Sequence, residues 1–158
     1  MITTTKFGVP FLVLCVVIQW WSKIDRVHVR HTAIAAGLSF LIGLAFNQII
    51  LLSLHRVRPY DAGISHLIIG RSSDWSFPSD HATASFAIAA AFTFHALRRR
   101  ATAFFLMAVL IGYSRIFVGT HYLTDIAGGA LTGICAAIMV RAFYKEGSRL
   151  DRFITGIL

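Results

Sequence analysis

His121 and Asp125 are the first pair in this sequence whose spacing suggests chemistry. They stand four residues apart, which places both side chains on one face of a helix. A carboxylate there can accept a hydrogen bond from one imidazole nitrogen, fix the tautomer and leave the other nitrogen as a nucleophile. A structural histidine near a helix N-terminus has the same spacing, so the pair alone leaves both interpretations open.

A second polar cluster, Ser79-Asp80-His81, precedes an alanine-rich apolar segment and predicts a helix start. The free backbone N–H groups and the dipole of a helix N-terminus favour an anion. A histidine in the first turn can protonate a leaving oxygen. An ordinary Ser/Asp N-cap beside an uninvolved histidine is the alternative.

Arg58 and Arg115 complete the set of candidates. Guanidinium groups match phosphate oxygens in bidentate geometry, although each arginine alone also fits a role as an anchor at a membrane interface. Taken together, the clusters predict one pocket. Two arginines and a helix N-terminus would hold phosphate there, while one histidine attacks and another donates a proton.

The elements that must position these residues are membrane-spanning helices. The 158-residue chain is 56% hydrophobic and 14% charged, with a mean hydropathy of +0.69, and its apolar residues form long runs. We expect an all-α, polytopic bundle of about five spans forming a single domain over residues 1–158. The expected segments are Phe7–Trp21, Thr32–Leu54, Ala82–Leu97, Ala101–Val118 and Tyr122–Phe143.

The net charge of +8 does not indicate nucleic-acid binding, because the basic residues form short clusters between apolar runs. Such clusters set topology and attract anionic lipids. Ten of the 15 lysines and arginines fall on the side of Arg98-Arg99-Arg100, which predicts that this side is cytoplasmic. All the candidate site residues fall on the opposite side, so the site would face away from the cytoplasm. Gly129 and Gly133 form a Gly-x-x-x-Gly pair that predicts close helix packing.

With these motifs, the chain resembles the type 2 phosphatidic acid phosphatase superfamily. Three motifs occur in order between Arg58 and Asp125. The first ends in Arg58-Pro59, and the second, Pro-Ser-x-His, is Pro78 to His81. The third reads Ser-Arg, five residues, His, three residues, Asp, and runs from Ser114 to Asp125 with no spacing error.

The resemblance implies that His121 attacks phosphorus, Asp125 orients it and His81 protonates the leaving oxygen. It also implies phosphate contacts from Arg58, Ser79 and Arg115, with Asp80 and Arg56 as further candidates. Neither metal nor other cofactor is implied.

The sequence departs from the family at two points. The family's first motif normally begins with a lysine, and Leu51 occupies that position. Either Arg56 or His55 supplies the missing charge, or the phosphate pocket is weaker. The membrane members usually have six spans, so with five this chain is either a short member or lacks the family's first helix.

Asp80 in the second motif resembles the bacitracin-resistance-type undecaprenyl-diphosphate phosphatases. The expected reaction is therefore hydrolysis of undecaprenyl diphosphate to undecaprenyl phosphate at the plasma (inner) membrane. The expected partners are the lipid substrate and membrane lipids, and the oligomeric state is left open. Phosphatidylglycerophosphate, phosphatidate and lipid A phosphatases stay open, as does a lipid phosphotransferase. A non-catalytic membrane protein is disfavoured by the complete motif set.

Overall fold

The computed structural model describes residues 1–157 and, over these residues, consists of helices joined by turns and one long loop. In chain order the helices are α1 (Ile2–Ile18), the 3₁₀ helix η1 (Gln19–Trp21), α2 (Arg26–Ser53), α3 (Asp80–Phe94), α4 (Arg98–Phe117), α5 (Leu123–Phe143) and α6 (Arg149–Thr155). The prediction of an all-α polytopic bundle is therefore confirmed.

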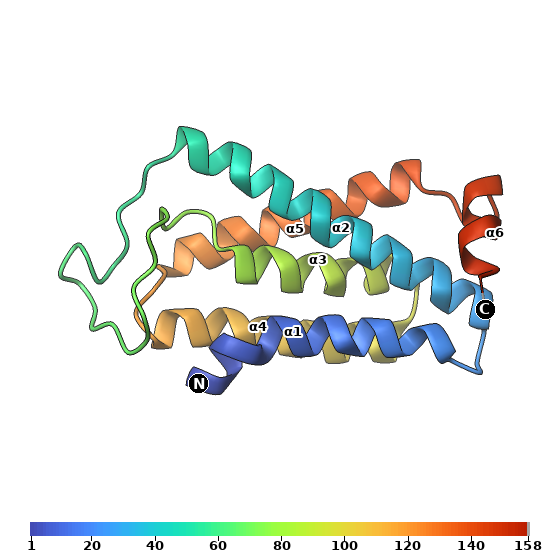
Figure 1. Cartoon of the computed structure of the whole chain (residues 1–158), viewed down its shortest axis with the longest axis horizontal. Coiled ribbons are helices and arrows are strands. Elements are labelled where there is room, and N and C mark those ends of the chain that lie inside the picture. Colours follow the sequence, from blue (N-terminus) through green and yellow to red (C-terminus); the bar gives the residue numbers. More distant parts are fainter. Residues whose placement is uncertain (158) are drawn as a thin grey trace.

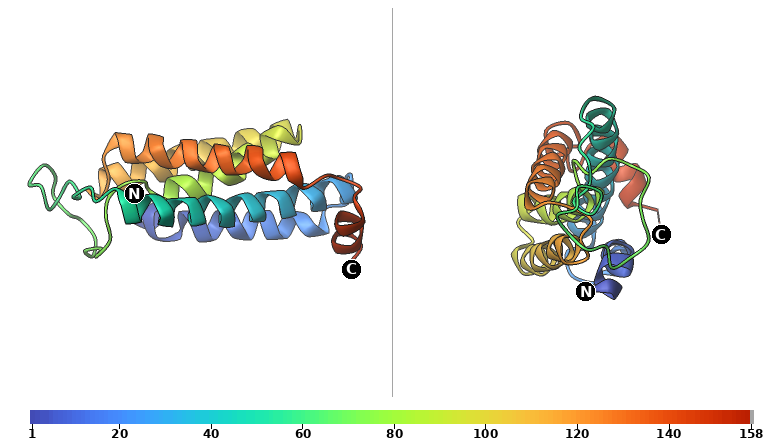
Figure 2. Two further views of the ribbon diagram at one scale, coloured as in Figure 1. Left: turned by 90° about the horizontal axis from the view of Figure 1, so that it is seen from above. Right: turned by 90° about the vertical axis from the view of Figure 1, so that its left-hand side faces the viewer.

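The helix α3 lies at the centre of the bundle. In Figure 1 it runs between α2 and α5 on one side and α1 and α4 on the other. The end-on view in Figure 2 shows the other long helices around it. Its alanines let the neighbours approach closely: Ala82, Ala87 and Ala89 are all at most 2% exposed. The helix is thus largely enclosed by protein.

Four helical stretches are long and apolar enough to cross a membrane: Ile2–Trp21, α2, α4 and α5. Each matches a predicted segment, although α1 begins five residues before Phe7 and α2 begins six before Thr32. The predicted third segment forms α3, which has 15 residues and is shorter than a span. The short helices η1 and α6 were not predicted.

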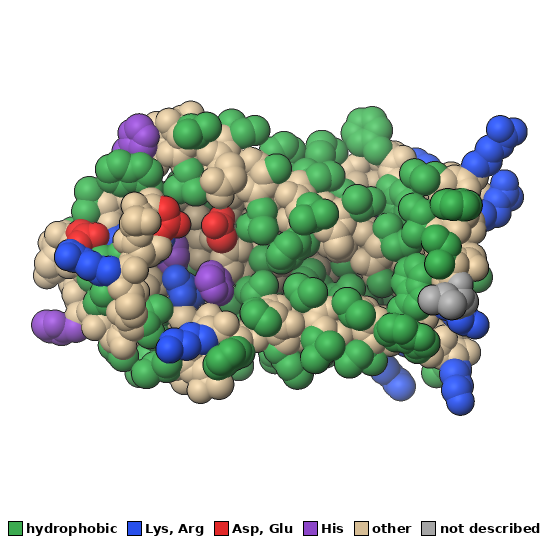
Figure 3. Space-filling view, viewed as in Figure 1, with side chains coloured by type: hydrophobic (Ala, Val, Ile, Leu, Met, Phe, Trp, Pro, Cys, Tyr) green, Lys and Arg blue, Asp and Glu red, His purple; other side chains and the backbone are tan. Residues whose placement is uncertain are grey.

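The outer surface of the bundle is apolar, whereas much of its interior is small or polar. Phe11 is 53% exposed, Leu41 62% and Leu131 64%, while Ser39, Asn47 and Thr83 are fully buried. Figure 3 shows hydrophobic side chains along the middle of the molecule and charged ones towards its two ends. A water-soluble domain buries its large apolar side chains, so this pattern indicates contact with lipid.

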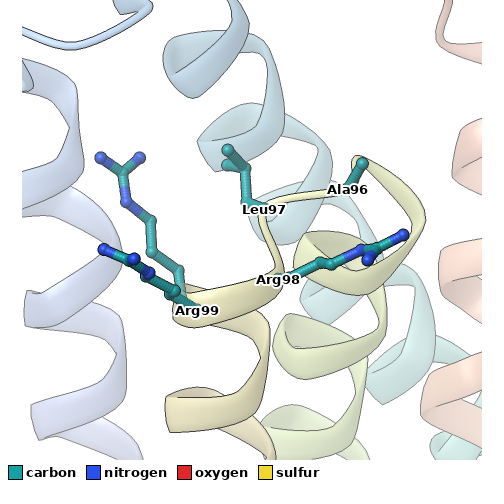
Figure 4. Close-up of a pocket in the computed structure, with 5 residues that line it drawn as sticks. Ala96, Leu97, Arg98 and Arg99 are labelled. Atoms are coloured by element: carbon teal, nitrogen blue, oxygen red, sulfur yellow. The ribbon is translucent and has the colours of Figure 1, made fainter.

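The two ends of the bundle differ. The motif end holds the long loop 54–79, the start of α3, the end of α4 and the start of α5. The basic end holds the starts of α2 and α4, the end of α5, and α6. At the turn from α3 to α4, residues 96–100 line a shallow pocket of about 300 Å³. Figure 4 shows Arg98 and Arg99 pointing in different directions from this turn. The triple-arginine segment therefore presents charge to more than one side.

The Gly-x-x-x-Gly pair of α5 does support close helix packing, and the helix that it contacts is α3. A Cβ atom on Gly129 would lie 2.5 Å from the Ser79 carbonyl oxygen, and one on Gly133 would lie 2.4 Å from that of Thr83. Both distances are shorter than any real contact. Only glycine permits this approach, which places the start of α3 directly against α5.

Candidate active site

The motif end brings together the predicted site residues from four parts of the chain. Arg58 comes from the long loop, Ser79 and His81 from the start of α3, Arg115 from the last turn of α4 and His121 from the turn before α5. Figure 3 shows histidine, basic and acidic side chains gathered at this end. Two backbone contacts fix the arrangement. The Ser79 N–H donates to the Asp125 carbonyl at 3.1 Å, and the Thr120 N–H to the Arg115 carbonyl, also at 3.1 Å.

His121 is 5% exposed and held at both ring nitrogens. Its Nδ1 lies 2.8 Å from the Ser76 carbonyl oxygen, and its Nε2 lies 3.3 Å from Nη1 of Arg58. A carbonyl can only accept and a guanidinium can only donate. The proton is therefore on Nδ1, and the lone pair on Nε2 points at Arg58.

The partner of His121 is not the one expected from the spacing. Asp125 lies 3.6 Å from His121 Nδ1, beyond hydrogen-bond distance, and the Ser76 carbonyl accepts the hydrogen bond from Nδ1–H instead. Asp125 is fully buried and accepts hydrogen bonds from the Ser76 hydroxyl at 2.5 Å and the Tyr122 N–H at 2.9 Å. It therefore acts on His121 through its charge and by holding the segment that carries Ser76.

Burial and the charges of Arg58 and Arg115 lower the pKa of His121, although Asp125 opposes them. A lowered pKa keeps the imidazole neutral at neutral pH. The neutral form is the one that carries a lone pair on Nε2.

Arg58 is 4% exposed and braced by the loop that surrounds it. Its Nη2 donates to the Asp74 carboxylate at 2.9 Å, its Nε to the Asp74 carbonyl at 3.0 Å, and its Nη1 to the Thr120 carbonyl at 3.0 Å. Burial works against ionisation of Asp74, but the Ser72 hydroxyl and the Arg58 guanidinium lower the pKa of Asp74 overall. The guanidinium is thus fixed beside His121.

Two buried donors at this end lack a hydrogen-bond partner within residues 1–157. They are the hydroxyl of Ser79, which is fully buried, and Nε of Arg115, which is 8% exposed. Leaving such a group unpaired costs about 1–3 kcal/mol, and native proteins rarely do so without a functional reason. Both belong to the residues predicted to bind phosphate.

His81 is half-buried and close enough to Arg115, His121 and Arg58 to interact electrostatically with each. Its neighbour Asp80 is engaged differently, because its carboxylate accepts a hydrogen bond from Asn47 Nδ2 on α2 at 2.7 Å. An ionised carboxylate repels phosphate and cannot donate to it. This geometry disfavours Asp80 as a phosphate ligand.

The two candidates for replacing the lysine at Leu51 are both engaged elsewhere. Arg56 Nη1 donates to Asp125 at 2.7 Å and to Thr124 at 2.6 Å, and its guanidinium lies 4.1 Å over the Tyr122 ring. The His55 ring lies 4.9 Å from that of Trp75. Arg56 is therefore placed to hold Asp125.

Sequence reasoning missed four residues at this site: Thr5, Asn47, Asp74 and Ser76. The Thr5 hydroxyl on α1 donates to that of Ser114 at 2.8 Å, which ties α1 to the third motif. Asn47 is a fully buried amide in a membrane-spanning helix, and such a residue could have been recognised as a signal. Nothing in the sequence marks the backbone carbonyl of Ser76 as an acceptor.

The geometry agrees with the comparison to protein families. The profile described as the PAP2 superfamily matches residues 32–149. The chain belongs to the PAP2 superfamily. It is 30% identical over 154 residues to "Undecaprenyl-diphosphatase BcrC" of Bacillus subtilis (strain 168), covering 98% of this chain and 77% of that protein.

The chain is also similar to a curated phosphatidylglycerophosphatase and to a solved structure. "Phosphatidylglycerophosphatase B" of the same strain is 30% identical over 113 residues, which cover 65% of this chain and 53% of that protein. The crystal structure of a transmembrane PAP2-type phosphatidylglycerolphosphate phosphatase from Bacillus subtilis superposes with a TM-score of 0.66 at 24% identity, covering 94% of this chain and 77% of that one.

The family and the fold together make this chain a multi-pass membrane protein and a lipid phosphatase. The predicted enzyme class is therefore confirmed, and its substrates are lipid phosphates.

Proposed function

We propose that the chain hydrolyses undecaprenyl diphosphate to undecaprenyl phosphate through a phosphohistidine on His121. One observation carries the mechanism. The Nε2 lone pair of a buried, Nδ1-protonated His121 faces Arg58, in a site where the Ser79 hydroxyl and Arg115 Nε are unpaired. A nucleophile surrounded by unused donors is the arrangement that transfer of a phosphoryl group requires.

In the proposed reaction, the terminal phosphate accepts hydrogen bonds from the unpaired donors. Nη1 of Arg58 keeps its place and exchanges its contact with His121 Nε2 for one with a phosphate oxygen. Nε2 then attacks phosphorus, and the bond between phosphorus and the bridging oxygen breaks. His81 donates a proton to that oxygen as the lipid monophosphate leaves. Water next attacks the phosphohistidine, His81 takes its proton, and free phosphate and neutral His121 are restored.

Positive charge for the transition state comes from Arg58 and Arg115, together with the start of α3. These groups are pre-positioned and buried, so they stabilise developing charge more strongly than they would in water. We therefore expect catalysis to persist when divalent metals are removed.

The substrate assignment rests on the similarity to the undecaprenyl-diphosphatase named above. The second candidate is phosphatidylglycerophosphate, which is supported by the similarity to "Phosphatidylglycerophosphatase B". We further propose that the motif end faces away from the cytoplasm of the plasma membrane. The ten basic residues at the opposite end support this orientation.

A substrate panel tests the proposal. Purified protein in detergent, with EDTA present, would be given undecaprenyl diphosphate, phosphatidylglycerophosphate and phosphatidate, and phosphate release would be measured. We expect the highest kcat/KM for the diphosphate. A higher kcat/KM for phosphatidylglycerophosphate would overturn the assignment of undecaprenyl diphosphate as the substrate. Activity that requires added magnesium would contradict the metal-free mechanism.

A further inference from the structure

A second cluster of ionisable side chains lies at the basic end of the bundle, away from the phosphatase site. His31 is in the second turn of α2, His95 directly follows α3, and Glu146 lies in the turn between α5 and α6. One potential metal-binding atom from each of these three residues lies within 4.8 Å of the other two. Three parts of the chain that are distant in sequence thus place two imidazoles and a carboxylate together.

His31 carries the most informative geometry. It is fully buried, and its Nδ1 lies 2.8 Å from Oδ1 of Asp151. Its Nε2 is buried and has no hydrogen-bond partner within residues 1–157. Because Nδ1 is occupied by Asp151, Nε2 is the atom that His31 offers to the cluster.

Asp151 fixes the state of His31. Its carboxylate accepts hydrogen bonds from the Tyr144 hydroxyl at 2.6 Å and the Gly147 N–H at 2.8 Å, and it lies 2.8 Å from Nδ1 of His31. It therefore keeps a proton on Nδ1 of His31 and the lone pair on Nε2. A carboxylate that orients a histidine in this way is the usual outer partner of a metal-bound imidazole.

The other two side chains are also suited to bind a cation. His95 offers an imidazole that makes an edge contact with that of His31, and the two ring centroids lie 4.7 Å apart. His28 Nδ1 lies 2.9 Å from both oxygens of Glu146, and its Nε2 lies 2.8 Å from the His95 carbonyl oxygen. His28 therefore holds the turn that carries Glu146 next to His95.

We propose that His31 Nε2, the His95 imidazole and the Glu146 carboxylate form a zinc-class metal site that joins α2, the end of α3 and the α5–α6 turn. Imidazole ligands select zinc and its neighbours among the transition metals over magnesium and calcium. Zinc bonds of about 2.0–2.2 Å require the ligand atoms to approach to about 3.4 Å. The three atoms lie within 4.8 Å of one another, so the ligands must move closer when the ion binds, and Glu146 would exchange its contact with His28 for one with the ion.

The site has a structural role, because it lies at the end of the bundle opposite His121. Zinc bound here would stabilise the basic end while phosphoryl transfer at the motif end stays independent of metal. The proposal is therefore separate from the proposed function. A chelator would lower the melting temperature of zinc-loaded protein and leave its phosphatase rate in place.

The test uses tag-free protein in detergent that has been stripped with a chelator and then equilibrated with zinc. We expect stoichiometric zinc and a melting temperature that rises with zinc concentration. Magnesium and calcium should give no such rise. His95→Ala and Glu146→Gln, which lie outside the packed core, should both lose the zinc and the zinc-dependent rise.

His66→Ala is the matched control, because His66 is an exposed histidine in the loop at the motif end. It should bind zinc as the unmodified chain does. Comparing each variant with and without zinc separates metal binding from a general loss of stability. Absence of zinc binding in the unmodified chain, or undiminished binding in both ligand variants, would overturn the proposal.

Discussion

Replacing Ser79 by alanine should lower the phosphatase activity without lowering the stability of the folded protein. The Ser79 hydroxyl is fully buried at the start of α3 and donates to no described group. In the proposed mechanism its partner is a phosphate oxygen. A hydrogen bond to a charged group contributes about 1.5–3 kcal/mol, which corresponds to a loss of about 10- to 150-fold in kcat/KM.

The same substitution should leave the folded protein at least as stable as before. No internal hydrogen bond is lost, and a buried group that costs about 1–3 kcal/mol when unpaired is removed. Phosphate release from the lipid diphosphate and thermal unfolding in detergent measure the two effects on one preparation.

Ser85→Ala is the matched control, because Ser85 is buried in the same helix and donates to the His81 carbonyl at 2.7 Å. It should lose about 0.5–1.5 kcal/mol of stability and keep its activity. The reasoning would be refuted if Ser79→Ala kept full activity, or if it lost stability in the way that Ser85→Ala does.

Four further outcomes are expected. His121→Ala should abolish both turnover and the trapped phosphoenzyme. His81→Ala should recover part of its rate on nitrophenyl phosphate, because that leaving group needs no proton. A phosphoenzyme that still forms in His121→Ala would reverse these roles. Arg56→Ala should lower kcat about fivefold, because losing a partly exposed ion pair costs about 1 kcal/mol. Inhibition by inorganic phosphate should not weaken. Weaker inhibition would mean that Arg56 contacts the phosphate directly. Asp125→Asn removes a charge that raises the pKa of His121, so the acid limb of kcat/KM on nitrophenyl phosphate should move to lower pH; a shift to higher pH would contradict this. In a background without cysteine, Ser73→Cys should react with an impermeant thiol reagent in intact cells and Lys23→Cys only after lysis, and the opposite result would invert the topology.

The helices could be predicted from the sequence because hydropathy reports directly on lipid contact. The expected segments coincide with α1 to α5, and the errors fall at their ends. Polar and basic residues such as Arg26 and His28 extend α2 beyond the apolar run, and hydropathy cannot detect helix there. The helix α6 is short and carries charge, so it gives no membrane signal. Its position depends on Asp151, which contacts His31 more than a hundred residues earlier in the chain.

The sequence could predict the side chains of the candidate site, but not the backbone groups that contact them. The motifs name His121, Arg58 and Ser79, and the structure places these residues at one end of the bundle. The partner of His121 could not be predicted, because the acceptor is the backbone carbonyl of Ser76 and every residue has one. The i, i+4 spacing suggested Asp125 instead, whose carboxylate turns to the Ser76 hydroxyl and to Arg56.

The close contact between α3 and α5 explains how a site built from such distant segments stays ordered. Gly129 lets the Ser79 carbonyl approach to a distance that no side chain would allow, and the Ser79 N–H then bonds the Asp125 carbonyl at 3.1 Å. The start of α3, with its unpaired hydroxyl, is thereby fixed directly against Asp125, whose charge acts on His121. A methyl group at position 129 would push the backbone of Ser79 away without touching any proposed catalytic side chain. The small residues of this interface therefore set the distance between the proposed nucleophile and the donors that would bind its substrate.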